Sequence, residues 1–148
     1  MSPASRAVGA ILVTRGDAPL TQSVLRAIEN QSMAPRSLTI IDVAGRRVTP
    51  FPADRVPRGA ELVRVGRARN LGDAIRRAYA QGAPFASEPW WWILHDDSAP
   101  EPECLSELVQ AGTVGKTVGA VGVKQLSWDG SRLLELGIFA TASARRLE

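Results

Sequence analysis

Residues 7–14 read AVGAILVT, an apolar run that no charged residue interrupts. Such a run, without polar alternation, is typical of a parallel strand that is covered on both faces. The turn Arg15-Gly16-Asp17 follows, and then residues 20–31 have the apolar spacing of an amphipathic helix with Thr21 as its cap. This stretch therefore predicts a strand and a crossover helix, the first unit of an α/β sheet.

The alternation of apolar strands and amphipathic helices continues along the chain. Further strands are expected at 37–43, 61–65, 90–94 and 118–123, and further helices at 71–81 and 102–111. A turn at 128–131 is expected to join two antiparallel strands, the second of which lies within Leu133–Phe139. This order predicts one α/β domain over residues 1–148, with a mostly parallel central sheet and helices on both faces.

The composition of this 148-residue chain excludes several classes of protein. Cys104 is the only cysteine and His95 the only histidine, so neither a disulfide framework nor a Cys or His metal cluster is expected. No apolar run is long enough to span a membrane, and residues 7–13 lack the cleavage site of a signal peptide. A cytoplasmic location is therefore expected.

The formal net charge is +3, and two of the eighteen basic residues are lysines, so sixteen are arginines. Arginine suits bidentate contacts with phosphate, but an excess of arginine is also typical of a GC-rich genome. The arginines are spread along the chain and form no single stripe, so no nucleic-acid partner is expected. The terminal pair Leu147-Glu148 is typical of a cloning site, and we expect the chain to be part of a longer protein.

Polar residues follow each of the first four expected strands. In parallel α/β sheets, ligands bind beyond the carboxyl ends of the strands, so we expect these residues to converge on one edge. In strand order they are Thr14 and Arg15, then Asp42, then Arg69, Asn70 and Gly72, and finally Asp96 and Asp97.

The acidic pair Asp96-Asp97 comes directly after the bulky apolar run at 90–94. Two adjacent carboxylates repel each other unless a positive charge lies beside them. Carboxylate oxygens suit Mg²⁺ or Mn²⁺, and such an ion shares its coordination with waters and phosphates. The pair therefore predicts a metal site. The alternative is that Asp97 or Ser98 caps the next segment while Asp96 is solvated.

The other residues at the strand ends have structural interpretations beside the functional ones. Asp42 lies where a nucleotide-binding sheet contacts a ribose or base, or it is a plain turn residue. Arg69, Asn70 and Gly72 suit a phosphate or sugar hydroxyl at a helix N-terminus, while Asn70 also suits a helix cap. Both interpretations can hold at once.

Several well-known motifs are absent. No G-x-G-x-x-G follows the first strand, and neither a Walker-type phosphate loop nor a G-x-S-x-G elbow occurs. His95 is interpreted as a rim residue beside the acidic pair, and Cys104 as a structural residue. The tryptophans are interpreted as packing residues, although Trp90 or Trp92 could line a sugar pocket.

In their order and spacing, five of these motifs resemble the inverting family-two glycosyltransferases, which have the GT-A fold. They are the Thr-containing turn at 13–16, LRAIENQSMAP at 25–35, the strand end at 40–42, Asn70-Leu71-Gly72 at a helix start, and Leu94-His95-Asp96-Asp97-Ser98. The resemblance covers Val8 to about Leu136. The sequence differs at the usual Asp-x-Asp triplet, whose first position is His95 here.

The resemblance implies a Rossmann-like sheet that binds a nucleotide-diphosphate sugar. Thr14, Arg15 and Asp42 would contact the base and ribose. The residues Arg69, Asn70 and Gly72 would line the nucleotide pocket.

The resemblance also implies the chemistry. Asp97, with Asp96, would hold Mg²⁺ or Mn²⁺ on the donor diphosphate. The sugar would pass with inversion to a glycan or lipid-linked acceptor, as in cell-wall biogenesis. The chain would be the donor-binding part of a longer protein of actinobacterial type, whose general base and acceptor region lie outside it. No catalytic residue is therefore assigned, and association with the inner face of the membrane is expected only through regions outside the chain.

Two other functions remain open. A nucleotidyltransferase or another sugar-nucleotide enzyme would use the same metal and carboxylate chemistry. It would be favoured by a glycine-rich loop with a lysine after the first strand, and Arg15-Gly16 is a poor match to that loop. The other alternative is a non-catalytic binding domain with the same fold.

Overall fold

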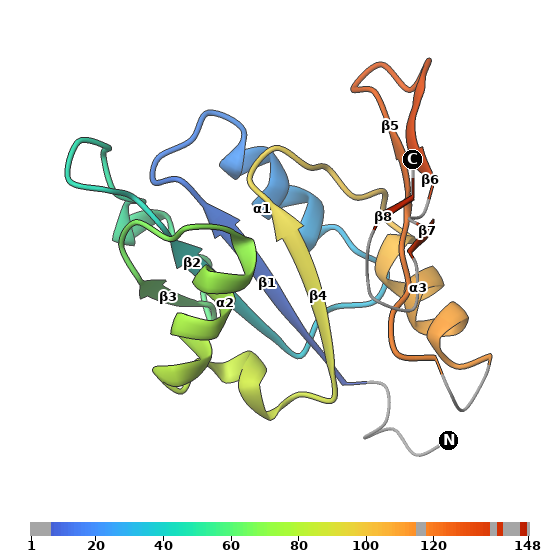
Figure 1. Cartoon of the computed structure of the whole chain (residues 1–148), viewed down its shortest axis with the longest axis horizontal. Coiled ribbons are helices and arrows are strands. Elements are labelled where there is room, and N and C mark those ends of the chain that lie inside the picture. Colours follow the sequence, from blue (N-terminus) through green and yellow to red (C-terminus); the bar gives the residue numbers. More distant parts are fainter. Residues whose placement is uncertain (1–6, 115–117, 137–138, 141–145, 148) are drawn as a thin grey trace. The chain divides into compact units, whose positions relative to one another are not determined.

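The computed structural model describes residues 7–114, 118–136, 139–140 and 146–147. The chain divides into two compact units, Met1–Leu105 and Ser106–Glu148. The first unit contains a four-stranded sheet in the order β3-β2-β1-β4, in which every pairing is parallel (Figure 1). An α/β arrangement around a parallel sheet is thereby confirmed, while a single domain over residues 1–148 stays a prediction.

Strands and helices alternate along the first unit. In chain order they are β1 (Val8–Thr14), α1 (Thr21–Glu29), β2 (Ser37–Asp42), the 3₁₀ turn η2 (Ala53–Arg55), β3 (Glu61–Arg64), α2 (Leu71–Ala80), the 3₁₀ turn η3 (Pro84–Ser87) and β4 (Trp90–His95). Most boundaries lie within two residues of those predicted, because the apolar periodicity ends where each element ends.

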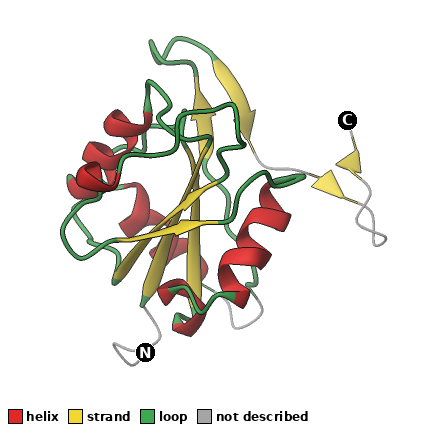
Figure 2. Ribbon diagram, turned by 90° about the vertical axis from the view of Figure 1, so that its left-hand side faces the viewer, coloured by secondary structure: helices red, strands yellow, loops and turns green. Residues whose placement is uncertain are grey.

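Every residue of β1 is buried, which explains its uninterrupted apolar sequence. Ile11 and Val13 point to one face, where they join a core cluster with residues of α2 and η3. The alternate residues Ala10 and Leu12 are also buried, and so is the inner side of α1. Helices lie on both sides of the strands (Figure 2).

β4 does not have two covered faces. Trp92 and Leu94 are buried, but Trp91 and Ile93 on the other face are 42% and 44% exposed. The apolar sequence of β4 would allow both of its faces to be buried. It does not require this, because apolar side chains are also common on protein surfaces.

The predicted cap at the start of α1 is wrong. Leu20 occupies the N-cap position and makes no side-chain cap hydrogen bond, while Thr21 is the first residue of the helix. The Thr21 hydroxyl is buried and lies 3.2 Å from the hydroxyl of Thr14. Its partner therefore comes from β1 and not from its own helix.

Gln31 joins the end of α1 to the segment that follows β4. Its amide nitrogen donates to the carbonyls of Ala27 (3.1 Å) and Glu101 (2.7 Å). Its oxygen accepts the N–H of Leu105 (2.9 Å), and the side chain is buried. Residues 101–105 are thus tied to α1, so the chain that leaves β4 is held at its far end.

α3 (Cys104–Gly112) begins at the boundary between the units. The second unit continues with β5 (Lys124–Leu126), β6 (Leu133–Leu136), β7 (Phe139–Ala140) and β8 (Arg146–Leu147). β5 and β6 are antiparallel around a turn at 127–132, as predicted. Residues 137–138 of the predicted pair lie outside the described residues.

The predicted strand at 118–123 is wrong, because these residues form no strand and β5 begins only at Lys124. Gly119 and Gly122 supply no side chain to pack, so a run that is apolar by composition lacks the contacts that stabilise a strand.

We expect the substitution Gln31→Leu to lower the free energy of unfolding by about 1–3 kcal/mol, because it leaves the buried backbone N–H of Leu105 without its partner. Gln22→Leu is the matched control, since the buried Nε2 of Gln22 has no hydrogen-bond partner among the described residues. The control should be neutral or stabilising in urea unfolding. Equal losses for both variants would contradict the role given to Gln31.

Candidate functional site

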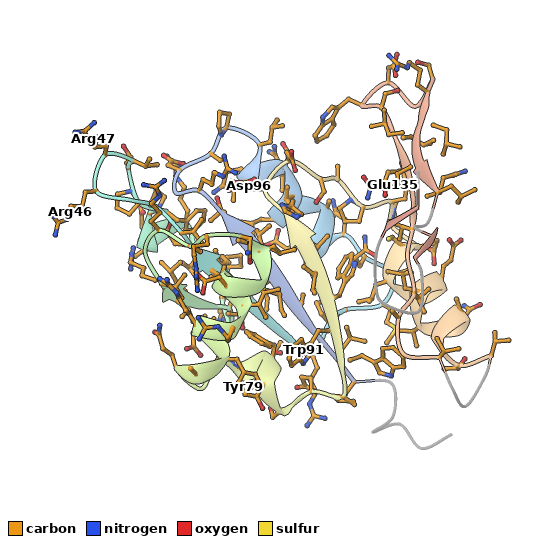
Figure 3. The ribbon with its side chains drawn as sticks, viewed as in Figure 1. Arg46, Arg47, Tyr79, Trp91, Asp96 and Glu135 are labelled. Carbon is orange, nitrogen blue, oxygen red and sulfur yellow. The ribbon has the colours of Figure 1, made fainter. Side chains whose placement is uncertain are left out.

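The carboxyl ends of β1 and β4 bring three of the predicted residues into contact. The register pairs Val13 with His95, so Asp96 lies beside Thr14. The Oδ2 atom of Asp96 accepts the N–H of Arg15 at 2.9 Å and lies 3.1 Å from the Thr14 hydroxyl. Figure 3 shows Asp96 at this edge of the sheet.

The hydroxyl of Thr14 contacts several polar groups at the carboxyl end of β1. It is buried within β1 and lies 2.8 Å from the carbonyl of Gly16. A hydroxyl carries one proton, so at a given moment it donates to only one of Gly16, Asp96 and Thr21. The N–H of Arg15 holds the carboxylate of Asp96 in every case.

Asp96 and Asp97 occupy the middle of a turn that Ser98 closes. The backbone N–H of Ser98 donates to the carbonyl of His95 at 3.3 Å, and its hydroxyl donates to the same oxygen at 2.8 Å. Asp96 is half-buried and Asp97 is exposed. Among the described residues, the Asp97 carboxylate has no hydrogen-bond or ion-pair partner. The turn thus presents one anchored carboxylate and one free carboxylate.

This donor set fits a hard divalent cation that shares its coordination with phosphate. Asp97 and the Oδ1 atom of Asp96 offer oxygen ligands on one turn, and Mg²⁺ typically takes one or two carboxylates together with phosphates and waters. The described residues contain no group of three or more His, Cys, Asp or Glu side chains that could hold a metal alone. Binding of Mg²⁺ or Mn²⁺ by Asp97 and Asp96 stays a prediction. The two carboxylates would hold such an ion together with the phosphates of a bound ligand.

Asp42 anchors the loop at residues 44–51. Its Oδ1 accepts the N–H of Ala44 at 2.8 Å and its Oδ2 accepts the N–H of Phe51 at 2.9 Å. The guanidinium of Arg64 lies 3.9 Å from Oδ2, and the side chain of Asp42 is 2% exposed. The turn role weighed for Asp42 is therefore present in the structure. A contact with a base or ribose stays a prediction, and it would need the loop to move.

The same loop rests on the turn that follows β1. The N–H of Asp17 donates to the carbonyl of Thr49 at 3.0 Å. Gly16 has φ +78°, and a Cβ atom there would lie 2.1 Å from that carbonyl oxygen. Only glycine fits this position, for both its backbone conformation and its space.

Asn70 is the cap of α2, as one of its two interpretations predicts. Its Oδ1 accepts the N–H of Asp73 at 2.9 Å. A Cβ atom on Gly72 would lie 3.5 Å from that oxygen, which is an ordinary contact, so α2 does not require glycine there. No hydrogen bond or ion pair joins residues 69–72 to Thr14 or Asp96 in the described part of the chain.

Asp73 was not among the predicted site residues, yet it organises three arginines. Its carboxylate accepts the backbone N–H of Arg69 at 3.1 Å and a guanidinium N–H of Arg76 at 2.7 Å, and it forms an ion pair with Arg77 at 3.1 Å. Arginines three and four positions after an aspartate on a helix are the signal that could have found it. The backbone N–H of Arg69 and then the Arg76 guanidinium hold the pKa of the buried Asp73 carboxyl at about 2.

An apolar groove of about 350 Å³ lies between α2 and β4. It is lined by Gly72, Ile75, Arg76, Tyr79, Trp91 and Ile93. The ring centroids of Tyr79 and Trp91 are 5.9 Å apart, and Figure 3 shows the two side chains close together. The sequence interprets the tryptophans as packing residues and offers Trp90 or Trp92, but not Trp91, as the alternative lining of a pocket. Successive side chains of β4 point to opposite faces, so Trp91 lies on the face opposite Trp90 and Trp92. The sequence alone does not show which of the two faces is exposed to solvent.

No protein-family model, curated protein or solved structure matches the chain. No helix in the described ranges is long and apolar enough to cross a bilayer. The chemistry of the edge must therefore be inferred from its own residues.

We expect Asp42→Asn to lower the free energy of unfolding by about 1–3 kcal/mol, because an amide turns an N–H donor toward either Ala44 or Phe51. Hydrogen exchange at the Phe51 amide should accelerate in the variant. Asp54→Asn, at an exposed position of the following segment, is the control and should change neither quantity. An unchanged exchange rate in Asp42→Asn would contradict the anchoring role.

Asp73 should make stability depend on pH in acid. Because its folded pKa is depressed, its contribution is complete above the ordinary value of 3.8 and is lost as the pH falls toward about 2. The stability difference between the wild-type chain and Asp73→Asn should therefore shrink across this window in urea unfolding. A difference that stays constant with pH would contradict this assignment.

Proposed function

We propose that the chain is the donor-binding part of an inverting glycosyltransferase. Its donor would be a nucleotide-diphosphate sugar, and its acceptor a glycan or a lipid-linked sugar. The observation that carries the proposal is the contact of Asp96 with Thr14 and Arg15, with Asp97 exposed on the same turn. This turn follows β4 beside the carboxyl end of β1, at the edge of a parallel sheet where such sheets bind ligands.

The charges of this edge suit a diphosphate with a metal ion. Mg²⁺ or Mn²⁺ on Asp97 and Asp96 would, when bound, neutralise negative charge on the leaving nucleoside diphosphate. Thr14 and the N–H of Arg15 keep Asp96 in position before a ligand arrives, so binding need not order it. The exposed side chain of Arg15 is available to a phosphate or ribose.

The inverting displacement also needs a base that accepts the proton of the acceptor hydroxyl. The motif resemblance assigns this base to a region outside the chain. The activity proposed for this chain alone is therefore donor binding, and sugar transfer is proposed for a longer protein that includes it.

Calorimetric titration tests the proposal with UDP, GDP and dTDP, each with and without Mn²⁺. One nucleotide should bind in a manner that depends on Mn²⁺. Asp97→Asn should weaken this binding by about 10–100-fold, and Thr14→Val should weaken it by about tenfold because Asp96 loses a partner. Asp54→Asn removes the same charge as Asp97→Asn at an exposed position away from the turn and should bind normally.

Three outcomes would redirect the proposal. A folded chain that binds no nucleotide with Mn²⁺ would contradict it and favour a non-catalytic domain. Tighter binding of a nucleoside triphosphate than of the diphosphate would favour a nucleotidyltransferase. Nucleotide binding that Asp97→Asn and Thr14→Val leave intact would place the donor elsewhere on the chain.

A further inference from the structure

The segment between residues 44 and 69 concentrates positive charge. It contains seven arginines and two acidic residues, so its net charge is +5, whereas that of the whole chain is +3. The rest of the chain is therefore net acidic. This segment runs from the loop after β2, through β3, to the start of α2.

Part of this charge is neutralised inside the protein, and part is not. Arg55 pairs with Asp17, Arg64 with Asp42, and Arg69 with Asp73. The exposed guanidinium groups of the other four arginines, Arg46, Arg47, Arg58 and Arg67, have no carboxylate partner among the described residues.

Three of these four unpaired arginines lie on or beside one turn. Arg46 and Arg47 are the middle residues of a turn that the N–H of Val48 closes on the carbonyl of Gly45 at 3.0 Å. A Cβ atom on Gly45 would lie 3.9 Å from the Cβ of Arg67, so the backbone of Arg67, which comes after β3, lies beside the start of this turn. We call Arg46, Arg47 and Arg67 the basic edge. Figure 3 shows Arg46 and Arg47 pointing away from the sheet into solvent.

The turn that carries Arg46 and Arg47 is held on both sides by hydrogen bonds. The two oxygens of Asp42 bind the backbone at Ala44 and Phe51, on both sides of the turn. Thr49 is fastened to the turn after β1 by the N–H of Asp17. The arginines are therefore presented from a fixed support, which lowers the entropy lost when a partner binds.

An apolar side chain accompanies the arginines. Val48 is 47% exposed and directly follows Arg47. A protruding turn with two arginines and an exposed aliphatic residue suits an anionic bilayer, where arginines contact lipid phosphates and the apolar group enters the acyl boundary. A surface for single-stranded nucleic acid would offer aromatic side chains for base stacking, and the basic edge contains none.

We propose that the basic edge, together with Val48, docks the chain onto an anionic lipid membrane. The membrane contact then belongs to the described residues and not only to regions outside the chain. The turn follows β2 and Asp96 follows β4, so both belong to the carboxyl edge of one parallel sheet. The docking does not depend on the proposed function, because membrane binding needs no nucleotide.

Vesicle co-sedimentation of the whole chain tests the docking. Vesicles of phosphatidylcholine with phosphatidylglycerol should bind the chain at low salt, whereas vesicles of phosphatidylcholine alone should not. Arg46→Gln/Arg47→Gln should weaken binding by about thirtyfold, since each basic residue near an anionic surface contributes roughly fivefold. Val48→Ser should weaken it severalfold without any change of charge.

The matched control is Arg26→Gln/Arg58→Gln, which removes two exposed arginines outside the basic edge. Both double variants lower the formal net charge from +3 to +1. The control should keep most of the vesicle binding. All substituted side chains are exposed, and urea unfolding would verify that each variant is folded.

Several results would overturn the docking. Equal losses in the two double variants would show that net charge alone attracts the chain. Absence of binding to the anionic vesicles would remove the membrane as the partner. Release from the vesicles by dilute inorganic pyrophosphate would assign the arginines to a free phosphate ligand. Stronger arginine-dependent binding to single-stranded RNA than to vesicles would assign them to nucleic acid.

Discussion

The position of β1 is the constraint on which the first unit depends. All seven of its residues are buried, and the strand is paired along both edges, with β2 on one side and β4 on the other. These two registers place Asp42 next to Thr14 and bring the turn that contains Asp96 to the same strand end. The residues of the carboxyl edge are distant in sequence, and they meet because β1 fixes where the strands on either side of it end.

Much of this arrangement could be predicted from the sequence, because burial on both faces leaves an uninterrupted apolar run such as residues 7–14. The prediction failed where composition and packing diverge. Residues 118–123 are apolar but contain two glycines, which have no side chain to pack, and they form no strand. Trp91 and Trp92 read alike in the sequence, yet only Trp92 is buried, because α2 leaves part of one face of β4 open.

The roles of the charged residues in the candidate site could likewise be predicted only in part. That Asp96 would meet Thr14 follows from parallel strands, whose ends share one edge. The part played by Asp42 depends on the path of the loop that returns to Phe51, and no local pattern encodes that path. Asp42 and Asp73 are buried and hold the backbone, whereas Asp97 and Arg46 are exposed and unpartnered within the described residues. The groups that hold the fold and the groups left free for a ligand are the same residue types, and only their surroundings separate them.

The central place of β1 also has a consequence for synthesis on the ribosome. Thr14 and Asp96 are 82 residues apart in the chain, and the edge of β1 that pairs with β4 has no partner until β4 emerges. At a translation rate of about 5–20 residues per second, this strand, which is buried at every residue in the folded protein, waits several seconds with its edge open. In that interval the nascent chain offers a strand edge to other chains, a hazard that ends only when β4 is in place. Although β1 is translated before the other three strands of this sheet, it is fully paired only when the last of them, β4, has been made.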